Sequence, residues 1–148
     1  VKTTMLARFA TTRTARLRVA TKSHQQTKIR AVRRPFRNFG TDVDASNFDK
    51  EVVEKSNEKI VILDAWADWC GPCKALAPKL EKVIQETDGA VELAKVDVSN
   101  SDNEGIVSTL KVSSIPAIFA YSKGKVVSEF KGNIPEGDIR KFVQGLMK

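Results

Sequence analysis

The spacing of apolar residues changes several times along the chain, and each change marks a predicted element. KIVILDAWA at 59–67 is an almost continuous apolar run, which is typical of a strand buried on both faces. VELAKVDV at 91–98 predicts a second strand. AIFAYS at 117–122 and VVSEFKG at 126–132 predict two further strands, and the Lys-Gly pair between them is a hairpin-turn signal.

Other stretches carry apolar residues at helical spacing. Ser46 is expected to cap a helix that runs to about Lys55. Its inward-facing residues are Phe48, Val52 and Val53. Residues 73–86 predict a longer helix, which Pro78 is expected to kink. Its apolar face consists of Leu76, Leu80, Val83 and Ile84.

Two more helices complete the predicted order of elements. A short helix is expected around 103–110, and a final one over about 135–146 with Pro135 near its first turn. The apolar face of the final helix consists of Ile139, Phe142, Val143 and Leu146. Strand-helix-strand units pair in parallel, whereas the closing hairpin pairs antiparallel. We therefore predict an α/β fold with a mixed sheet and helices on both of its faces.

The charge is divided unevenly between the two ends of the chain. Residues 1–41 contain eleven Lys or Arg and no Asp or Glu, whereas residues 42–148 contain fourteen basic and eighteen acidic residues. The formal net charge of +7 therefore belongs to the N-terminal segment and does not indicate a nucleic-acid-binding domain. No stretch approaches the roughly 18 apolar residues of a membrane-spanning helix, so we expect no stable membrane association.

The N-terminal segment is rich in Lys, Arg and Thr and free of acidic residues, which is the composition of a mitochondrial transit peptide. RRPFRNF at 33–39 places arginines before aromatic residues, the context in which matrix processing enzymes cut. We therefore expect a largely disordered transit peptide over 1–39 and one folded domain over 40–148. The alternative is a basic arm that contacts RNA or acidic lipid, and RNA binding would then depend strongly on salt.

Cys70 and Cys73 are the only two cysteines, and Gly71 and Pro72 separate them. A structural zinc site needs four ligands and a catalytic one needs three and a water, yet the only histidine, His24, lies in the N-terminal segment. We therefore expect no metal site, although an iron–sulfur cluster shared between two chains stays open. A structural disulfide and a pair of inert thiols stay open as well.

A Cys-x-x-Cys pair between a strand and a helix is typical of a redox site. Cys73 is expected to open the helix, which places Cys70 near the unpaired N–H groups of the first turn and lowers the pKa of Cys70. Cys73 is expected to be the more buried of the two. Cys70 is thus the predicted nucleophile and Cys73 the resolving residue. Pro72 fixes the loop, and Gly71 leaves room for a substrate.

WCGPCK at 69–74 resembles the signature of the thioredoxin family residue for residue. The resemblance covers about 42–148, including VILDAWADWCGPCKALAP, AKVDV, the SIP that ends at Pro116, and Gly124 and Gly132. It implies a thioredoxin fold with about five strands, no bound cofactor and a redox-active Cys70–Cys73 disulfide. It also implies a monomeric protein-disulfide reductase that thioredoxin reductase recycles with NADPH. The N-terminal segment resembles that of mitochondrial members, which implies the mitochondrial matrix and peroxiredoxins among the partners.

Asp64 and Lys95 are candidate catalytic residues. Asp64 follows four apolar residues, and burial there is expected to raise its pKa. The alternative is a polar residue that bonds to the backbone at the end of a strand. By resemblance, Asp64 is the buried acid that helps to deprotonate Cys73, and Lys95 is the lysine paired with it.

The resemblance also implies an apolar docking patch around a cis proline. The patch consists of Trp69, Gly71, Pro72, Ile115, Pro116 and Gly132. The Ile115 backbone is expected to pair with an extended substrate, and Trp66 is expected in the core in place of Trp69. Ala65 and Ala117 depart from the usual family pattern. A different class remains open, a partner-binding module in which the two cysteines form a redox-sensitive latch.

Overall fold

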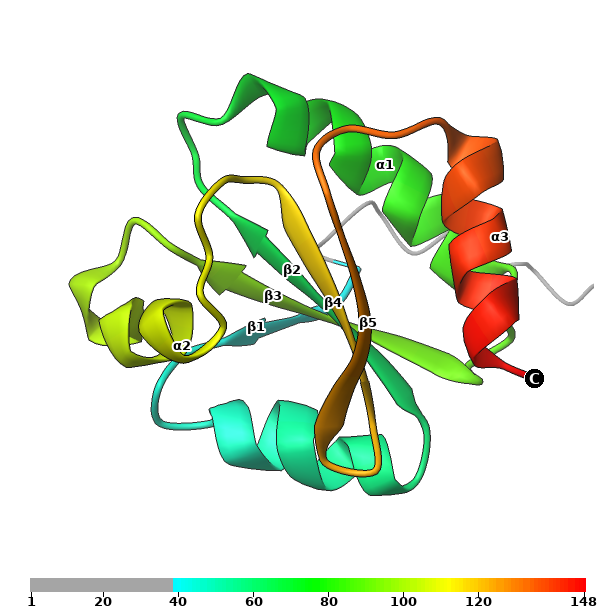
Figure 1. Ribbon diagram of the computed structural model, residues 1–148, viewed down its shortest axis with the longest axis horizontal. Helices are drawn as coiled ribbons and strands as arrows, with labels where there is room; N and C mark the ends of the chain where they lie inside the picture. Colours follow the sequence, from blue (N-terminus) through cyan, green and yellow to red (C-terminus); the bar gives the residue numbers. More distant parts are fainter. Residues whose placement is uncertain (1–38) are drawn as a thin grey trace, which may run out of the picture. The chain divides into compact units, whose positions relative to one another are not determined.

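The computed structural model describes residues 39–148, which fold around a five-stranded mixed sheet with the order β1-β3-β2-β4-β5 (Figure 1). The predicted transit peptide lies outside the described residues, except for Phe39. The strands are β1 (Thr41–Val43), β2 (Ile60–Trp66), β3 (Val91–Asp97), β4 (Ala117–Ser122) and β5 (Lys125–Lys131). β1, β3 and β2 are parallel, and β4 and β5 run antiparallel to their neighbours. The predicted fold class is confirmed.

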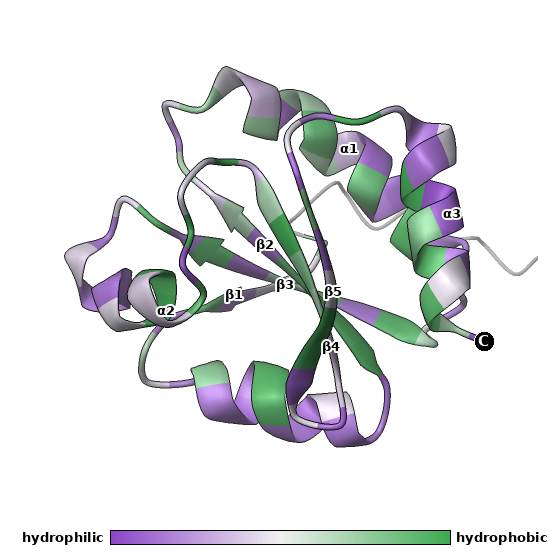
Figure 2. Cartoon of the chain, in the orientation of Figure 1, coloured by the Kyte–Doolittle hydropathy of each residue, from purple (hydrophilic) through white to green (hydrophobic). Residues whose placement is uncertain are grey.

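Helices cover both faces of the sheet. The α-helices are α1 (Gly71–Gln85), α2 (Glu104–Thr109) and α3 (Glu136–Leu146). α1 and α3 pack on one face, over Ile62, Leu93 and Ile118, whereas α2 and a helical segment before β2 lie on the other face. β2 is therefore buried on both faces, as its continuous apolar run predicts. Figure 2 shows hydrophilic and hydrophobic stretches alternating along α1 and α3, as expected of helices with one buried side.

The segment before β2 differs from the predicted capped helix. It forms a π-helical turn at Asp49–Glu54 and a 3₁₀ turn at Lys55–Asn57. Ser46 does not cap it, because the Ser46 backbone N–H and hydroxyl both donate to the carboxylate of Asp44. Val52 is nevertheless buried, and Phe48 and Val53 pack against the core as predicted.

The start of α1 and the presence of β1 also differ from the prediction. α1 begins at Gly71, two residues before the predicted start, because Pro72 lacks an N–H and suits a first helical turn. Pro78 lies inside α1, which continues without a break to Gln85. β1 was not predicted from the residues, since three residues are too few to show a hydrophobic period. It extends the sheet by pairing with β3.

Candidate active site

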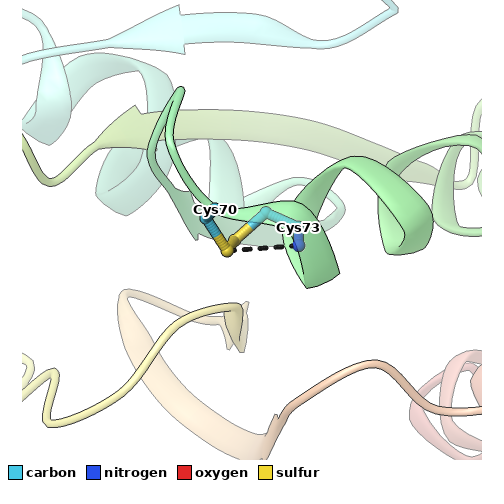
Figure 3. The surroundings of a disulfide bond; sticks show 2 residues. All are labelled: Cys70 and Cys73. Carbon is cyan, nitrogen blue, oxygen red and sulfur yellow. Dashed lines mark hydrogen bonds between the residues drawn. A yellow bond between two sulfur atoms is a disulfide. The ribbon is translucent and has the colours of Figure 1, made fainter.

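The two cysteines lie where β2 leads into α1, and their sulfur atoms form a disulfide (Figure 3). Cys70 is the N-cap of α1, and its sulfur accepts a hydrogen bond of 3.2 Å from the backbone N–H of Cys73. Cys73 is therefore the third residue of the helix, and the prediction that it opens the helix is wrong. The bond shows that a first-turn N–H group points toward the Cys70 sulfur, which agrees with the redox interpretation.

The short connection from β2 holds Cys70 in this position. The Cys70 N–H donates to the carbonyl of Ala67 at 3.0 Å, and the N–H of Lys74 donates to the Cys70 carbonyl at 3.3 Å. Gly71 and Pro72 are exposed between the cysteines. Cys70 is 4% exposed and Cys73 is 3% exposed, so burial does not separate the two residues as predicted.

An apolar surface adjoins the disulfide. Trp69 is 73% exposed and Trp66 is only partly buried, so neither belongs to the fully buried core. Ile115 packs against the cluster that contains both cysteines. The bond between Ile115 and Pro116 is cis, as expected, and Pro116 is buried.

Gly132 joins this surface through the backbone. Its N–H donates to the carbonyl of Pro116 at 2.8 Å, which ties the segment after β5 to the loop before β4. The φ angle of Gly132 is +84°, a left-handed conformation that favours glycine. Ile115 thus packs against the cysteines, Trp69 directly precedes Cys70 in the sequence, and Gly132 is bonded to Pro116; the docking role of these residues stays a prediction.

Asp64 lies on the face of β2 that α1 covers. It is 3% exposed, and none of the described residues supplies a hydrogen-bond partner for its Oδ1 atom. Burial raises the pKa of Asp64 from 3.8 to about 7, while the positive charge of Lys95 opposes the rise and the negative charge of Glu81 adds to it. The predicted direction of this pKa is confirmed.

Lys95 does not form the expected direct pair with Asp64. The two residues are partners in the register of β2 and β3, but Lys95 Nζ binds Glu81 Oε1 of α1 at 2.6 Å. Sequence reasoning missed Glu81. A signal was present, because Glu81 follows Cys73 by eight residues and thus shares its helix face, where a charged residue among apolar ones needs a partner.

A cavity of ≈ 510 Å³ lies beside Asp64. Its lining includes Asp64, Cys73 and Lys95 and six further charged and amide side chains. Those are Asp42, Asp44, Lys74, Asp97, Asn100 and Asn103. Cys73 lines this cavity and Cys70 does not, which places Cys73 as the cysteine on the side of the buried acid.

Within residues 39–148, no group of three or more His, Cys, Asp or Glu side chains is arranged to hold a metal ion. None of the helices in this part of the chain is both long and apolar enough to cross a membrane.

Comparison with known proteins places the site in a family. The family model described as Thioredoxin matches residues 41–145. "Probable thioredoxin-2" of Caenorhabditis elegans is 34% identical over 109 residues and is covered over 74% of its length by 70% of this chain. "Thioredoxin, mitochondrial" of Bos taurus is 38% identical, and 70% of this chain covers 60% of its length. "Thioredoxin" of Haemophilus influenzae is 35% identical, and 64% of this chain covers 87% of it. The chain therefore belongs to the thioredoxin family, whose members are thiol-disulfide oxidoreductases with a redox-active cysteine pair.

Proposed function

We propose that this protein reduces disulfide bonds in other proteins with the Cys70–Cys73 dithiol. The observation that carries the proposal is the disulfide at the N-terminus of α1, where the sulfur of Cys70 accepts the N–H of Cys73. When the disulfide is reduced, the same N–H groups stabilise the thiolate of Cys70. Thiolate, not thiol, is the species that attacks a disulfide.

The reaction has two exchange steps. The Cys70 thiolate attacks one sulfur of the substrate disulfide, forms a mixed disulfide and releases the other substrate sulfur as a thiolate. The thiol of Cys73 then loses its proton, attacks the Cys70 sulfur and releases the second substrate thiolate. The substrate disulfide gains two electrons, and the enzyme ends as the Cys70–Cys73 disulfide.

Asp64 is the proposed acceptor of the Cys73 proton. Its pKa of about 7 suits a base that works near neutral pH, because it can both take and return a proton there. The cavity that Asp64 shares with Cys73 has several charged and amide side chains in its lining and is large enough for water to relay the proton. Lys95 acts on Asp64 through its charge alone in this arrangement, because its ammonium binds Glu81.

The apolar surface beside the disulfide is the proposed substrate-docking patch. An extended substrate segment would pair with the backbone of Ile115, which precedes the cis proline. The patch consists of Trp69, Gly71, Pro72, Ile115, Pro116 and Gly132. The exposure of Trp69 supports this role, because tryptophan is enriched at protein interfaces, where it buries a large apolar ring.

We further propose that the protein acts as a monomer in the mitochondrial matrix. There, an NADPH-dependent thioredoxin reductase returns two electrons to the disulfide, and peroxiredoxins are among the substrates. Residues 1–39 are the proposed transit peptide. The basic, acid-free composition of this segment and the similarity to mitochondrial relatives support this location.

The test follows NADPH consumption by the full chain with thioredoxin reductase and a disulfide-bonded protein such as insulin. We expect rapid turnover that is lost in Cys73→Ser, which would instead accumulate a mixed disulfide on Cys70. Absence of turnover in a protein whose disulfide opens and closes normally would refute the reductase function. Partner binding that survives replacement of both cysteines would identify a binding module instead.

A further inference from the structure

The ammonium group of Lys95 has three carboxylates on neighbouring elements. In the sheet, Lys95 is the register partner of Asp42 on β1 and of Asp64 on β2. Glu81 reaches it from α1 above the sheet. Among residues 39–148, Lys95 forms an ion pair only with Glu81, at 2.6 Å, and both side chains of this pair are largely buried.

This choice of partner leaves Asp64 without a direct ion pair. Asp64 is the more buried of the two sheet carboxylates, and its Oδ1 atom has no partner in the described part of the chain. A buried carboxylate gains most from a direct ion pair, because the pair offsets the loss of hydration. The register places Lys95 on the strand next to Asp64, yet the Lys95 ammonium binds Glu81 instead.

We propose that Glu81 is a positioning residue that holds the ammonium of Lys95 away from Asp64 and so leaves the Asp64 carboxyl free to exchange a proton with Cys73. The inference rests on the proposed reductase function for its purpose, but its geometry is independent of turnover. Glu81 does not touch the reacting atoms and acts only through Lys95.

The other groups near Asp64 come from four elements of the fold. Besides Lys95, β3 contributes Asp97 to the shared cavity, and β1 and the residue after it contribute Asp42 and Asp44. α1 contributes Cys73 and Lys74 to the cavity and Glu81 beside it. β4 presents Ile118, which is apolar, as the register partner of Asp64. Lys95 is thus the cation that the register places beside the carboxyl, and its position decides how strongly Asp64 is stabilised as an anion.

Removing the charge of Glu81 should lower the pKa of Asp64 for two reasons of the same sign. The negative charge that raises this pKa is lost, and Lys95 becomes free to pair directly with Asp64. An opposite charge within about 4–6 Å lowers a carboxyl pKa by about 1–3 units. Replacing Lys95 should raise the pKa of Asp64, because the positive charge that lowers this pKa is lost.

The direct measurement is the ¹³C NMR titration of the Asp64 carboxyl carbon in the oxidised full chain. In Glu81→Gln we expect the midpoint to fall by about one pH unit or more. In Lys95→Gln we expect it to rise, and Glu81→Asp should stay closer to the wild type because it keeps the charge. Glu86→Gln is the matched control, since Glu86 binds Arg140 at the far end of α1 and should leave the midpoint unchanged.

A double variant separates positioning from a simple charge effect. If Glu81 acts through Lys95, Glu81→Gln should shift the midpoint much less in the Lys95→Gln background than in the wild type. Equal shifts in both backgrounds, or an unchanged midpoint in Glu81→Gln, would overturn the proposal. Thermal unfolding of each variant verifies that the fold is retained, and Glu81→Ala replaces Glu81→Gln in both backgrounds if Glu81→Gln does not fold.

The functional readout uses reduced protein carrying 2-nitro-5-thiobenzoate in a disulfide with Cys70. Attack by Cys73 on the Cys70 sulfur releases the coloured thiolate, and the pH midpoint of the release rate should move with the Asp64 titration in each variant. A wild-type protein that releases no thiolate, while the NMR midpoints shift as expected, would refute the reductase function and leave the positioning role of Glu81 intact.

Discussion

Replacing Asp64 by asparagine should make the protein more stable at alkaline pH. The substitution keeps the shape of a side chain that is 3% exposed but removes its ability to ionise. Burial raises the pKa of Asp64 from 3.8 to about 7 in the folded protein. The folded state thus holds a proton that the unfolded chain releases over most of this interval, which makes stability depend on pH.

The sign and size of the effect follow from this pKa. Below pH 3.8 Asp64 is protonated in both the folded and the unfolded state, so it does not change the free energy of unfolding. Between pH 3.8 and 7 only the unfolded chain ionises, so the free energy of unfolding falls as the pH rises. Each pKa unit corresponds to about 1.4 kcal/mol, so the contribution lost above pH 7 is about 4 kcal/mol. Asp64→Asn should recover most of it at pH 8.

The assay is urea unfolding of the oxidised wild type and Asp64→Asn at several pH values from 3 to 9. Subtracting one curve from the other cancels the acid-range contributions of carboxylates whose pKa is lowered by ion pairs, such as Glu86, Glu92 and Glu136. Asp68→Asn is the control, because it makes the same substitution at an exposed position in the same loop region. A flat difference for Asp64→Asn, or a loss of stability at pH 8, would refute the reasoning.

Three further substitutions test other parts of the structure. Trp69→Ala should leave the unfolding free energy unchanged but raise KM for a protein disulfide, because the side chain is 73% exposed; an unchanged KM would exclude it from docking. Ser56→Ala should cost about 1–3 kcal/mol in urea unfolding, because the buried hydroxyl accepts the N–H of Gly124 at 2.8 Å; a negligible loss would contradict this. Gly132→Ala should destabilise by about 1 kcal/mol because φ is +84°, whereas Gly137→Ala in α3 should not; equal effects would contradict the backbone argument.

The elements that could be predicted from sequence are those whose burial is extensive. The apolar run of β2 predicts a central strand because both of its faces pack against helices, and β4 follows the same logic. The helical spacing of Leu76, Leu80 and Ile84 predicts the buried side of α1. In each case the residues that the local pattern predicts to be buried are the ones that the packed fold buries.

The sequence was insufficient where a few hydrogen bonds decide the structure. β1 is held by pairing with β3, and three residues show no hydrophobic period. Ser46 has the chemistry of an N-cap, but Asp44 two residues away competes successfully for its hydroxyl. The start of α1 depends on Pro72 and on the sulfur of Cys70, which is not among the usual capping groups.

In the candidate site, too, local features could be predicted from the sequence and contacts between distant elements could not. The spacing of Cys70 and Cys73 predicts a redox pair because exchange chemistry needs two sulfurs that can meet, and the disulfide follows from local geometry. The partner of Lys95 depends on α1 crossing the sheet above β3, which no local pattern contains. A lysine with three carboxylates within one environment has several reasonable partners on sequence grounds, and only the packing of the helix selects Glu81.

Stability and the proposed function make opposite demands on Asp64. A direct ion pair with Lys95 would stabilise the ionised carboxyl and the fold, but it would also weaken Asp64 as an acceptor for the Cys73 proton. The unpaired, buried acid has a pKa close to neutrality and destabilises the fold at alkaline pH. Substitutions that stabilise the protein at pH 8 by acting on Asp64 should therefore slow release of the second substrate thiolate. Asp64→Asn should do so by removing the base, and Glu81→Gln by letting Lys95 pair with it.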